Sequence, residues 1–493
     1  MAKITVDGTV YEVRAGRTIL QALDDLGVLM NGVDVPHYCW HPKLSIDGSC
    51  RLCQVEVEGL PKLQIACNTP VKDGMVIRTD TAEVSEAREG VMELLLVNHP
   101  LDCPICDQAG ECKLQDYAYE YGVAHARTRE PRRAAKKNVS LGPTIVFDQE
   151  RCILCRRCVR FCREVPGTGE IGVVNRGDHS VIETFPGIPL DNDYSMNVAD
   201  ICPVGALTTK DFRFKIRVWF LEDVPGVCTG CSRGCNVWLG TANNKVYRYV
   251  PRRNDEINET WICDEGRLSY REIGSPDRID RPLVRGELGV LETAPIDAAI
   301  AEAARRLSAL IEAKGPGVIG VVASGHATDE DFAAAAAWLD AAGIDTRGLA
   351  VREGSSDDLL IQAEKAANGE GARRAGFADA SPVIDRLTGG ALDALVVMGH
   401  DLLALEALGG PDAALAALAR LETLIVLDTH RSALERVARV VIPVRHLAEK
   451  SGHVTNFEGV VQEVAPAVAA RGETLPEAEV FVRLARAMAE DAS

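Results

Sequence analysis

Alternating apolar and polar positions at the start of the chain predict a small β-sheet. The stretch ITVDGTVYEV alternates on both sides of Asp7-Gly8, a residue pair typical of a two-residue hairpin turn. TILQALDDLG follows with the pattern of a short helix that ends at Gly27. LCQVEVEG and GMVIRTD have the composition of two further strands. Residues 1–80 are therefore predicted to form a domain of one sheet and one helix.

The pattern of the next 190 or so residues is more irregular and predicts three short units. EVSEAREGVMELLLVN, residues 83–98, is expected to form an amphipathic helix that leads directly to His99. RTREPRRAAKK, residues 127–137, is a basic loop that is either solvated or in contact with an acidic partner surface. Changes in texture place the units at 81–138, 139–215 and 216–271.

After residue 271 the pattern becomes regular again. Ala-rich helical stretches such as DAAIAEAARRLSALIEAKG alternate with apolar runs that have the length of buried strands: GVIGVVAS, DALVVMG, TLIVLD and VARVVIPV. This alternation predicts an α/β domain with a largely parallel sheet over residues 272–493. The whole chain is therefore expected to be a multidomain protein that combines α/β and α+β parts.

Composition and charge narrow the class of protein. The 493 residues predict three or more domains. Lys and Arg number 54 against 72 Asp and Glu, and the net charge of -18 favours solubility and disfavours nucleic acid as the main partner. The start, MAKITVDGTVYEV, lacks the apolar region of a secretion signal, and no run of 18 apolar residues occurs. We expect a cytoplasmic, reducing location.

All 16 cysteines lie between residues 39 and 263. In a reducing compartment, dense Cys-x-x-Cys groups indicate metal or redox centres rather than disulfides. The first group has the spacing C-x10-C-x2-C-x13-C, which is close to a ferredoxin-type 2Fe-2S site. Zinc also suits four thiolates, but the small residues in DGSC would let backbone amides approach cluster sulfurs and favour iron. The predicted ligands are Cys39, Cys50, Cys53 and Cys67.

The second group combines one histidine with three cysteines in HPLDCPICDQAGEC. An isolated histidine is usually structural, but this one stands where three thiols lack a fourth ligand. Imidazole in place of a thiolate removes a negative charge and raises the reduction potential, other things being equal. We predict a 4Fe-4S cluster held by His99, Cys103, Cys106 and Cys112.

The third group, CILCRRCVRFC, resembles a bacterial ferredoxin run, in which the fourth cysteine serves a second cluster. Residues 163–201 contain no cysteine, so no second run follows for Cys162 to join. We interpret Cys162 as a buried free thiol, with the alternative that it replaces Cys202. The predicted 4Fe-4S ligands are Cys152, Cys155, Cys158 and Cys202, the last from CPVGAL.

The fourth group has the spacing C-x2-C-x3-C-x27-C, and a zinc ribbon is the structural alternative. Its place immediately before a long α/β domain favours a third 4Fe-4S cluster, held by Cys228, Cys231, Cys235 and Cys263. Four clusters without an evident substrate pocket predict a protein that conducts electrons.

The order and spacing of these motifs resemble the large iron-sulfur subunit, of the NuoG type, of NADH:quinone oxidoreductase in bacterial respiratory complex I. The stretches that carry the resemblance are CRLCQVEVEG, HPLDCPICDQAGECKLQD, ERCILCRRCVRFCREVPG, DICPVGALT and WICDEGR. The resemblance implies a β-grasp 2Fe-2S domain followed by a His/Cys-ligated segment and a ferredoxin-like 4Fe-4S domain. It also implies the ligand sets given above, including His99 and Cys202.

The C-terminal part is similar to molybdopterin oxidoreductases in REIGSPDRIDRPLVR and EKSGHVTNFEGVVQ. Molybdenum enzymes of this kind bind the metal through a Cys or selenocysteine near the start of the pterin domain, but this chain has no cysteine after residue 263. Residues 272–493 are also few for enclosing two pterins. We expect a reduced domain without molybdenum or molybdopterin, retained for packing.

The resemblance implies an electron-transfer subunit that receives electrons from a flavin subunit oxidising NADH and passes them toward a quinone-site iron-sulfur subunit. Such a subunit is part of a large hetero-oligomer at the inner face of the plasma membrane, with no membrane span of its own. The alternatives are a ferredoxin-like subunit of a soluble NAD-linked hydrogenase or formate dehydrogenase, a catalytic molybdoenzyme, and a scaffold protein whose sites hold zinc.

Overall fold

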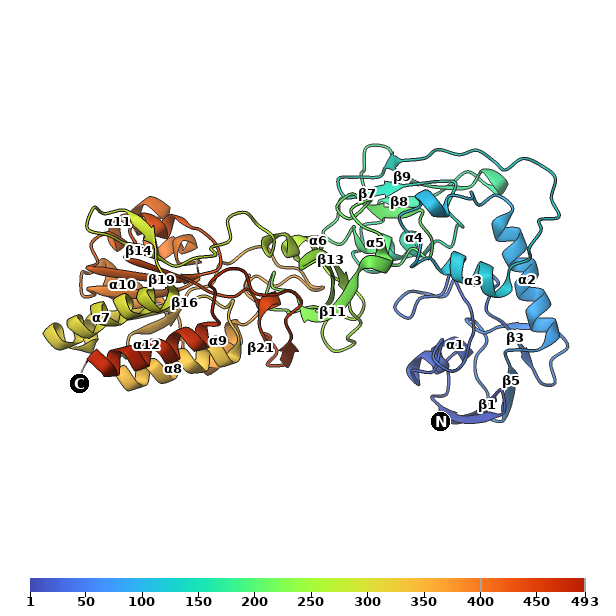
Figure 1. Cartoon of the computed structure of the whole chain (residues 1–493). Helices are drawn as coiled ribbons and strands as arrows, with labels where there is room; N and C mark the ends of the chain where they lie inside the picture. Colours follow the sequence, from blue (N-terminus) through green and yellow to red (C-terminus); the bar gives the residue numbers. More distant parts are fainter. Residues whose placement is uncertain (400, 492–493) are drawn as a thin grey trace. The chain divides into compact units, whose positions relative to one another are not determined.

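The computed structural model describes residues 1–399 and 401–491 (Figure 1). The chain divides into two compact units, Met1–Leu221 and Glu222–Ser493. Among the described residues, no helix is both long and apolar enough to cross a membrane.

A five-stranded sheet forms the N-terminal part of the first unit. Strands β1 and β2 meet at Asp7 and Gly8, whose φ angles of 45° and 84° are those of the predicted hairpin turn. Helix α1 begins at a capping box made by Thr18 and Gln21. The predicted hairpin, helix and two further strands are therefore confirmed. In spatial order the strands are β2 (Thr9–Val13), β1 (Ala2–Val6), β5 (Met75–Arg78), β3 (Gln54–Val57) and β4 (Gln64–Ile65), and α1 spans Ile19–Asp25.

The rest of the first unit consists of short elements joined by long loops. Helix α2, Ala82–Leu96, confirms the predicted helix but ends two residues earlier, and it packs against α3, Lys113–Tyr121. Strands β10, β7 and β6 form a small sheet, and β8 pairs with β9. The remaining bounds are β6 Val139–Ser140, β7 Ile145–Phe147, α4 Arg157–Glu164, β8 Ile171–Val174, β9 Val181–Thr184, α5 Asn197–Asp200 and β10 Leu207–Thr209, with 3-10 helices η1 Cys103–Ile105, η2 Gly177–His179 and η3 Val218–Phe220.

The second unit begins with an antiparallel three-stranded sheet in the order β11-β12-β13. A short helix, α6, follows it, and a hairpin of β21 and β22 packs against β11. The bounds are β11 Glu222–Val227, β12 Asn236–Ala242, β13 Lys245–Pro251, α6 Asp264–Leu268, η4 Ser269–Glu272, β21 Gly452–Thr455 and β22 Val461–Val464.

A seven-stranded sheet forms the core of the second unit, in the order β15-β14-β20-β19-β18-β16-β17. The neighbours from β20 to β17 run parallel, whereas β14 and β15 are antiparallel, so the predicted largely parallel sheet is confirmed. The strand bounds are β14 Leu283–Arg285, β15 Leu291–Thr293, β16 Ile319–Ala323, β17 Arg347–Leu349, β18 Ala394–Met398, β19 Thr423–Asp428 and β20 Val440–Pro443.

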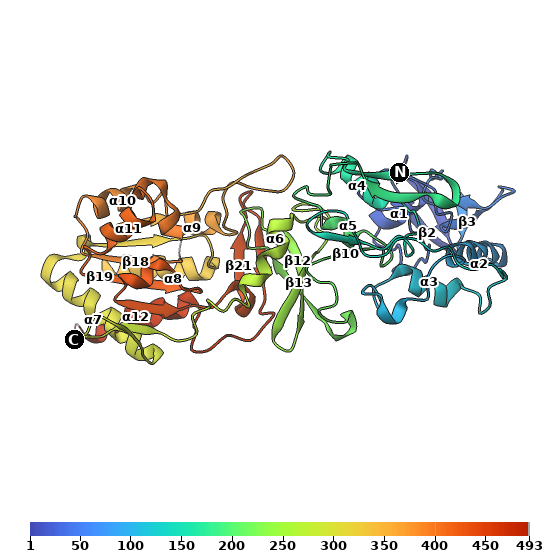
Figure 2. The same ribbon diagram turned by 90° about the horizontal axis from the view of Figure 1, so that it is seen from above.

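Helices cover both faces of this sheet, which explains why its strands are apolar along their whole length. Ile319, Val321 and Ala323 of β16 pack with the long helices α7, α8 and α12, whereas Val322 packs with α10 and α11. Figure 2 shows the helices on either side of the strands. The helix bounds are α7 Ile296–Lys314, α8 Asp329–Ala342, α9 Gly369–Arg374, α10 Ser381–Thr388, α11 Pro411–Leu418 and α12 Glu477–Asp491, with η5 Pro316–Val318, η6 Asp401–Ala404, η7 Glu406–Leu408, η8 Ala433–Arg436 and η9 Leu447–Glu449.

Candidate functional site

The first cysteine group gathers around the start of β3. Cys53 directly precedes β3, Cys67 follows β4, and Cys39 and Cys50 come from the long loop before them. Side-chain hydrogen bonds join Cys39 to Cys50 and to Cys67, and these bonds lower the pKa of the Cys39 thiol. A further hydrogen bond joins Cys53 to Cys67. The structure thus brings all four predicted ligands together.

The second group lies between α2 and α3. Cys103 opens η1, and Cys112 is the N-cap residue of α3. Burial raises the pKa of the Cys112 thiol to about 11, and the charges of Cys106 and Cys103 act in the same direction, so the three thiols are neighbours. Burial of His99, helped by the charge of Arg151, lowers the pKa of this histidine to about 4.

His99 therefore has the chemistry of a metal ligand at neutral pH. Its imidazole is uncharged there, as a ligand must be. Its Nδ1 atom is buried and has no hydrogen-bond partner in the described part of the chain. A buried ring nitrogen without a partner is costly unless another group binds it. The donor set of His99 and three thiols is suited to an iron-sulfur cluster.

The third group surrounds one cavity at the start of α4. Cys152, Cys155, Cys158 and Cys202 all line this cavity together with apolar side chains such as Phe147 and Leu207. Leu154 and Arg156, which stand between the ligands, have left-handed φ angles of 53° and 57°. Such backbone is unfavourable for residues other than glycine and is found mainly where function requires it.

Cys162 does not line that cavity. It is buried on α4, where burial and the charge of Glu170 raise the pKa of its thiol to about 12. Its carbonyl accepts hydrogen bonds from the amides of Thr168 and Gly169. The structure thus groups Cys202, and not Cys162, with the first three thiols of the run.

The fourth group lies wholly within the second unit. Cys228, Cys231 and Cys235 lie on the connection from β11 to β12, and Cys263 is the N-cap residue of α6. Burial raises the pKa of the Cys235 thiol well above its ordinary value, and the charges of Cys228, Cys231 and Cys263 act in the same direction, so the four thiols converge. Its scaffold is a regular sheet, unlike the loops of the other three groups.

Backbone amides point at sulfur atoms in all four groups, and three such contacts lie in the third and fourth. The amide of Leu154 donates to Cys152 Sγ at 3.4 Å, the amide of Gly230 donates to Cys228 Sγ at 3.4 Å, and the amide of Gly266 donates to Cys263 Sγ at 3.3 Å. Hydrogen bonds to sulfur stabilise thiolates and tune cluster potentials. These donors fit the expectation that the sites hold iron-sulfur clusters, which when bound supply one-electron redox chemistry.

Two glycines allow the groups to pack, and sequence reasoning did not single them out. A Cβ atom on Gly266 would lie 2.8 Å from Cys228 Sγ, and one on Gly205 would lie 2.2 Å from Cys106 Sγ. Both glycines follow a ligand cysteine closely, in CDEGR and CPVGAL. That proximity in sequence is the only signal that could have indicated them.

The third group is a neighbour of both the first and the second group. Burial raises the pKa of the Cys155 thiol, and the charges of two nearby arginines lower it. The charge of Cys39, in the first group, is a smaller effect that also raises it. The carbonyl of Pro203, next to Cys202, accepts a hydrogen bond from the amide of Lys113, next to Cys112 in the second group.

Within residues 1–399 and 401–491, no three or more His, Cys, Asp or Glu side chains are arranged as ligands of a single metal ion.

A larger cavity of about 590 Å³ lies in the second unit, at the carboxyl ends of the parallel strands. Ser324, Gly399, Asp428 and Val444 come from the ends of four neighbouring strands and line it. This is the edge at which open α/β sheets bind ligands, because the strand order reverses between β16 and β18. Thr229 and Gly230, next to Cys228, line the same cavity.

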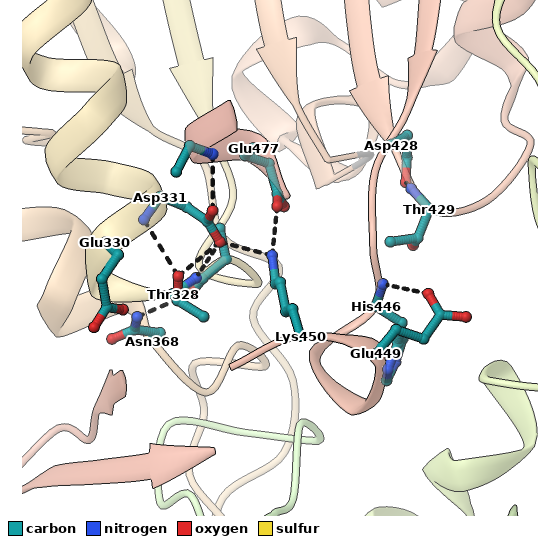
Figure 3. Close-up of polar contacts among 12 residues, drawn as sticks. Thr328, Glu330, Asp331, Asn368, Asp428, Thr429, His446, Glu449, Lys450 and Glu477 are labelled. Carbon is teal, nitrogen blue, oxygen red and sulfur yellow. Dashed lines mark hydrogen bonds and ion pairs between the residues drawn. The ribbon is translucent and has the colours of Figure 1, made fainter. Parts of the chain in front are cut away.

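A buried charge network lies beside this cavity. Figure 3 shows Lys450 between Asp331 and Glu477. The Lys450 ammonium donates to Asp331 Oδ2 at 2.7 Å and also to Glu477, which lines the cavity. Burial raises the pKa of Glu477 to about 8, the charge of Asp331 adds to the rise, and Lys450 opposes it. Glu477 is therefore more easily protonated than an ordinary glutamate.

Comparison with protein families finds five matching regions along the chain. In chain order they are a 2Fe-2S iron-sulfur cluster binding domain (residues 1–82), the NADH-ubiquinone oxidoreductase-G iron-sulfur binding region (88–127), the NADH-quinone oxidoreductase subunit 3 ferredoxin-like domain (142–208), the NADH-ubiquinone oxidoreductase NDSU1/NuoG-like 4Fe-4S domain (231–271) and molybdopterin oxidoreductase (408–487).

Curated relatives match the iron-sulfur part of the chain. The G subunit of the Rickettsia conorii NADH-quinone oxidoreductase is 45% identical over 58% of this chain and 41% of its own length. The G subunit of the Streptomyces coelicolor enzyme is 40% identical over 67% of this chain and 38% of its own length. The mitochondrial NADH-ubiquinone oxidoreductase 78 kDa subunit of Neurospora crassa is 42% identical over 62% and 41%. The chain thus spans less than half the length of the curated relatives it matches.

One solved structure with detectable similarity is an NAD+-reducing [NiFe]-hydrogenase in its H2-reduced state. The match covers 44% of this chain and 91% of that chain, with 28% sequence identity and a TM-score of 0.39.

Proposed function

We infer that this chain, whose iron-sulfur domains belong to the NuoG-type family of NADH-quinone oxidoreductase subunits, is an electron-transfer subunit of an NADH:quinone oxidoreductase of the respiratory complex I type. It relays electrons from a subunit that binds NADH and flavin toward a quinone site. It has no substrate-converting site of its own.

One observation carries this function: three groups of soft ligands lie close together in the first unit, and the third group is a neighbour of both others. Neighbouring centres that each accept one electron form a chain through which electrons can pass. The matches to 2Fe-2S and 4Fe-4S binding domains support the same conclusion.

We propose one 2Fe-2S cluster and three 4Fe-4S clusters. The 2Fe-2S cluster is held by the group at the start of β3, and each of the other three groups holds a 4Fe-4S cluster. Cys162 is a buried free thiol, since it stands apart from the cavity that Cys202 lines. The ligand sets are Cys39, Cys50, Cys53 and Cys67; His99, Cys103, Cys106 and Cys112; Cys152, Cys155, Cys158 and Cys202; and Cys228, Cys231, Cys235 and Cys263.

We also propose five domains, because each of them contains or overlaps a matched family region. They span residues 1–80, 81–138, 139–215, 216–271 and 272–493. The last domain resembles molybdopterin oxidoreductases, but we propose that it holds neither molybdenum nor molybdopterin. It contains no cysteine that could bind the metal.

The partners proposed are a flavin subunit that oxidises NADH and the iron-sulfur subunits of a quinone site, in a large hetero-oligomer. The proposed location is peripheral to the inner face of the plasma membrane, held there by the complex. The names of the relatives, which are subunits of NADH-quinone oxidoreductases, support this assembly.

Iron and sulfide analysis, together with electron paramagnetic resonance during a redox titration, tests the function. The full chain, loaded under anaerobic conditions, should contain about fourteen iron atoms and show reducible centres of both cluster types. Zinc in place of iron, with no acid-labile sulfide, would exclude electron transfer. Molybdenum or tungsten in the sample would instead support a catalytic molybdoenzyme.

A further inference from the structure

Helix α4 connects the third cysteine group to the first. Its N-terminal end carries Cys158, and its side chains reach the loop that leads from Cys39 to Cys50. Glu164 at the far end of the helix accepts hydrogen bonds from Ser45, and Arg156 before the helix pairs with Asp47 at 2.6 Å. These contacts hold the helix against the loop.

Two arginines on this helix span both groups. Arg157 donates to the carbonyl of Ile201, next to Cys202, at 3.1 Å, and to the carbonyl of Trp40, next to Cys39. Arg160 donates to the carbonyl of Cys39 itself, to the carbonyl of Cys155 at 3.4 Å, and to the carbonyl of Ser45. Each guanidinium thus bridges the ligand loops of the first and the third group.

The partners of these two arginines are all neutral. Within the described residues, neither guanidinium forms an ion pair with a carboxylate, and the Nε atoms of both are buried without a hydrogen-bond partner. Arginine stays charged in proteins, and a buried charge is costly unless an opposite charge compensates it.

The opposite charge is supplied when the thiol groups bind their clusters. A cluster held by four thiolates is an anion, and it gains another negative charge when it accepts an electron. We propose that Arg157 and Arg160 are positioning residues that serve as shared counter-ions of the first and third groups and raise the reduction potentials of the centres held there. This inference rests on the proposed function and adds the residues that tune two neighbouring centres together.

The counter-ion role and the higher reduction potentials both follow from the charge of the arginines, and not only from the contacts that hold the helix against the loop. Arg156 and Glu164 already fasten the helix to the loop, so a neutral residue at position 160 would leave those contacts in place. It would remove one positive charge from beside both groups. The reduced state, which carries more negative charge, would lose more stabilisation than the oxidised state.

The test uses the full chain loaded anaerobically, with Arg157→Gln and Arg160→Gln as variants and Arg163→Gln as the matched control. Arg163 is exposed on the same helix, so its change removes the same charge away from the groups. Electron paramagnetic resonance at a fixed potential should show the reduced-to-oxidised ratio of both centres falling about tenfold in each variant, equivalent to about 59 mV for a one-electron couple. The control should leave both ratios unchanged.

Lysine variants separate charge from structure. Arg157→Lys and Arg160→Lys keep the positive charge and should restore most of the ratio. If the glutamine variants load no iron while the lysine variants do, the charge is required and the inference stands. Unchanged ratios in loaded glutamine variants, or loss of iron in glutamine and lysine variants alike, would overturn it. Absence of clusters from the parent chain would instead overturn the proposed function itself.

Discussion

Lys450 and Arg278 in the second unit have different kinds of partner from Arg157 and Arg160 in the first unit. In the second unit, Lys450 lies between Asp331 and Glu477, and the buried Arg278 pairs with Glu449 at 2.6 Å. In the first unit, Arg157 and Arg160 donate, among the described residues, to five backbone carbonyls, four of them at or next to a predicted ligand cysteine. Carboxylates thus neutralise Lys450 and Arg278, and also Arg151 of the first unit, which pairs with Asp102 and Asp148, whereas Arg157 and Arg160 have no carboxylate partner in the described part of the chain.

This difference indicates what each unit depends on for stability. The seven-stranded sheet is covered on both faces by apolar helices, so its core is complete without a metal. The first unit has short elements and long loops that are drawn together around thiol groups. Metal binding and folding are coupled where the ligands are the main link between segments.

Removing the iron should give the largest effect. When a chelator strips the loaded full chain under anaerobic conditions, we expect the calorimetric unfolding transition of the first unit to broaden or disappear. The transition of the second unit's seven-stranded sheet should keep its midpoint, because its core contains no ligand thiols. Equal losses in both transitions would contradict the comparison between the units.

Cys202 and Cys162 provide a sharper test within the first unit. Cys202→Ser should remove about four iron atoms, one whole 4Fe-4S centre, because its thiol lines the cavity with Cys152, Cys155 and Cys158. Cys162→Ser is the matched control and should leave the iron content of the full chain intact. The reverse result in iron analysis would make Cys162 the fourth ligand.

Lys450→Met should destabilise the second unit, since it leaves Asp331 and Glu477 buried without their cation. Removing one partner of a buried ionic network costs about 3–5 kcal/mol. Lys314→Met is the control, because Lys314 pairs with Asp393 at the surface and its loss should cost much less than the loss of Lys450. Denaturant unfolding of the full chain measures both, and equal costs would show that the network does not stabilise this unit.

Glu477 should have a smaller effect, which is on how the stability of the second unit depends on pH. Its pKa of about 8 lies above the ordinary value of 4.5, so folding takes up a proton between these pH values. The stability from this group is complete below about pH 4.5 and is lost as pH rises through about 8. Glu477→Gln, which mimics the protonated form, should remove this part of the pH dependence.

The measurement for Glu477 is the unfolding midpoint of the second unit across that pH range. Glu479→Gln on the same helix is the control, because Glu479 is partly exposed and pairs with Arg483. The control should keep the decline in stability toward high pH. A decline of the same size in Glu477→Gln would show that Glu477 is already ionised in the folded chain.

Local patterns in the sequence predicted much of the fold. The Asp7-Gly8 hairpin, the helix before His99 and the buried strands of the second unit were all predicted, because each depends on residues close together in the chain. The end of α2 was misplaced by two residues, since the last turn of a helix is decided by what packs on it.

Contacts between distant segments could not be predicted in the same way. The Lys450 network joins Asp331 and Glu477 from separate helices. The sequence did not indicate the close approach of Gly205 to Cys106 or the carbonyl partners of Arg160. Nothing in the residues near each of these positions specifies the partner.

The sequence by itself determined the chemistry that this chain can offer: groups of thiols, with one imidazole, at spacings typical of cluster ligands. Spacing within a loop is enough for that, because neighbouring ligands are held close by the chain itself. Only the tertiary structure decided the proximity of the three groups in the first unit, the separation of Cys162 from the cavity of Cys202, and the sharing of two arginines between groups. These depend on how loops more than a hundred residues apart pack together, and packing is a property of the whole fold.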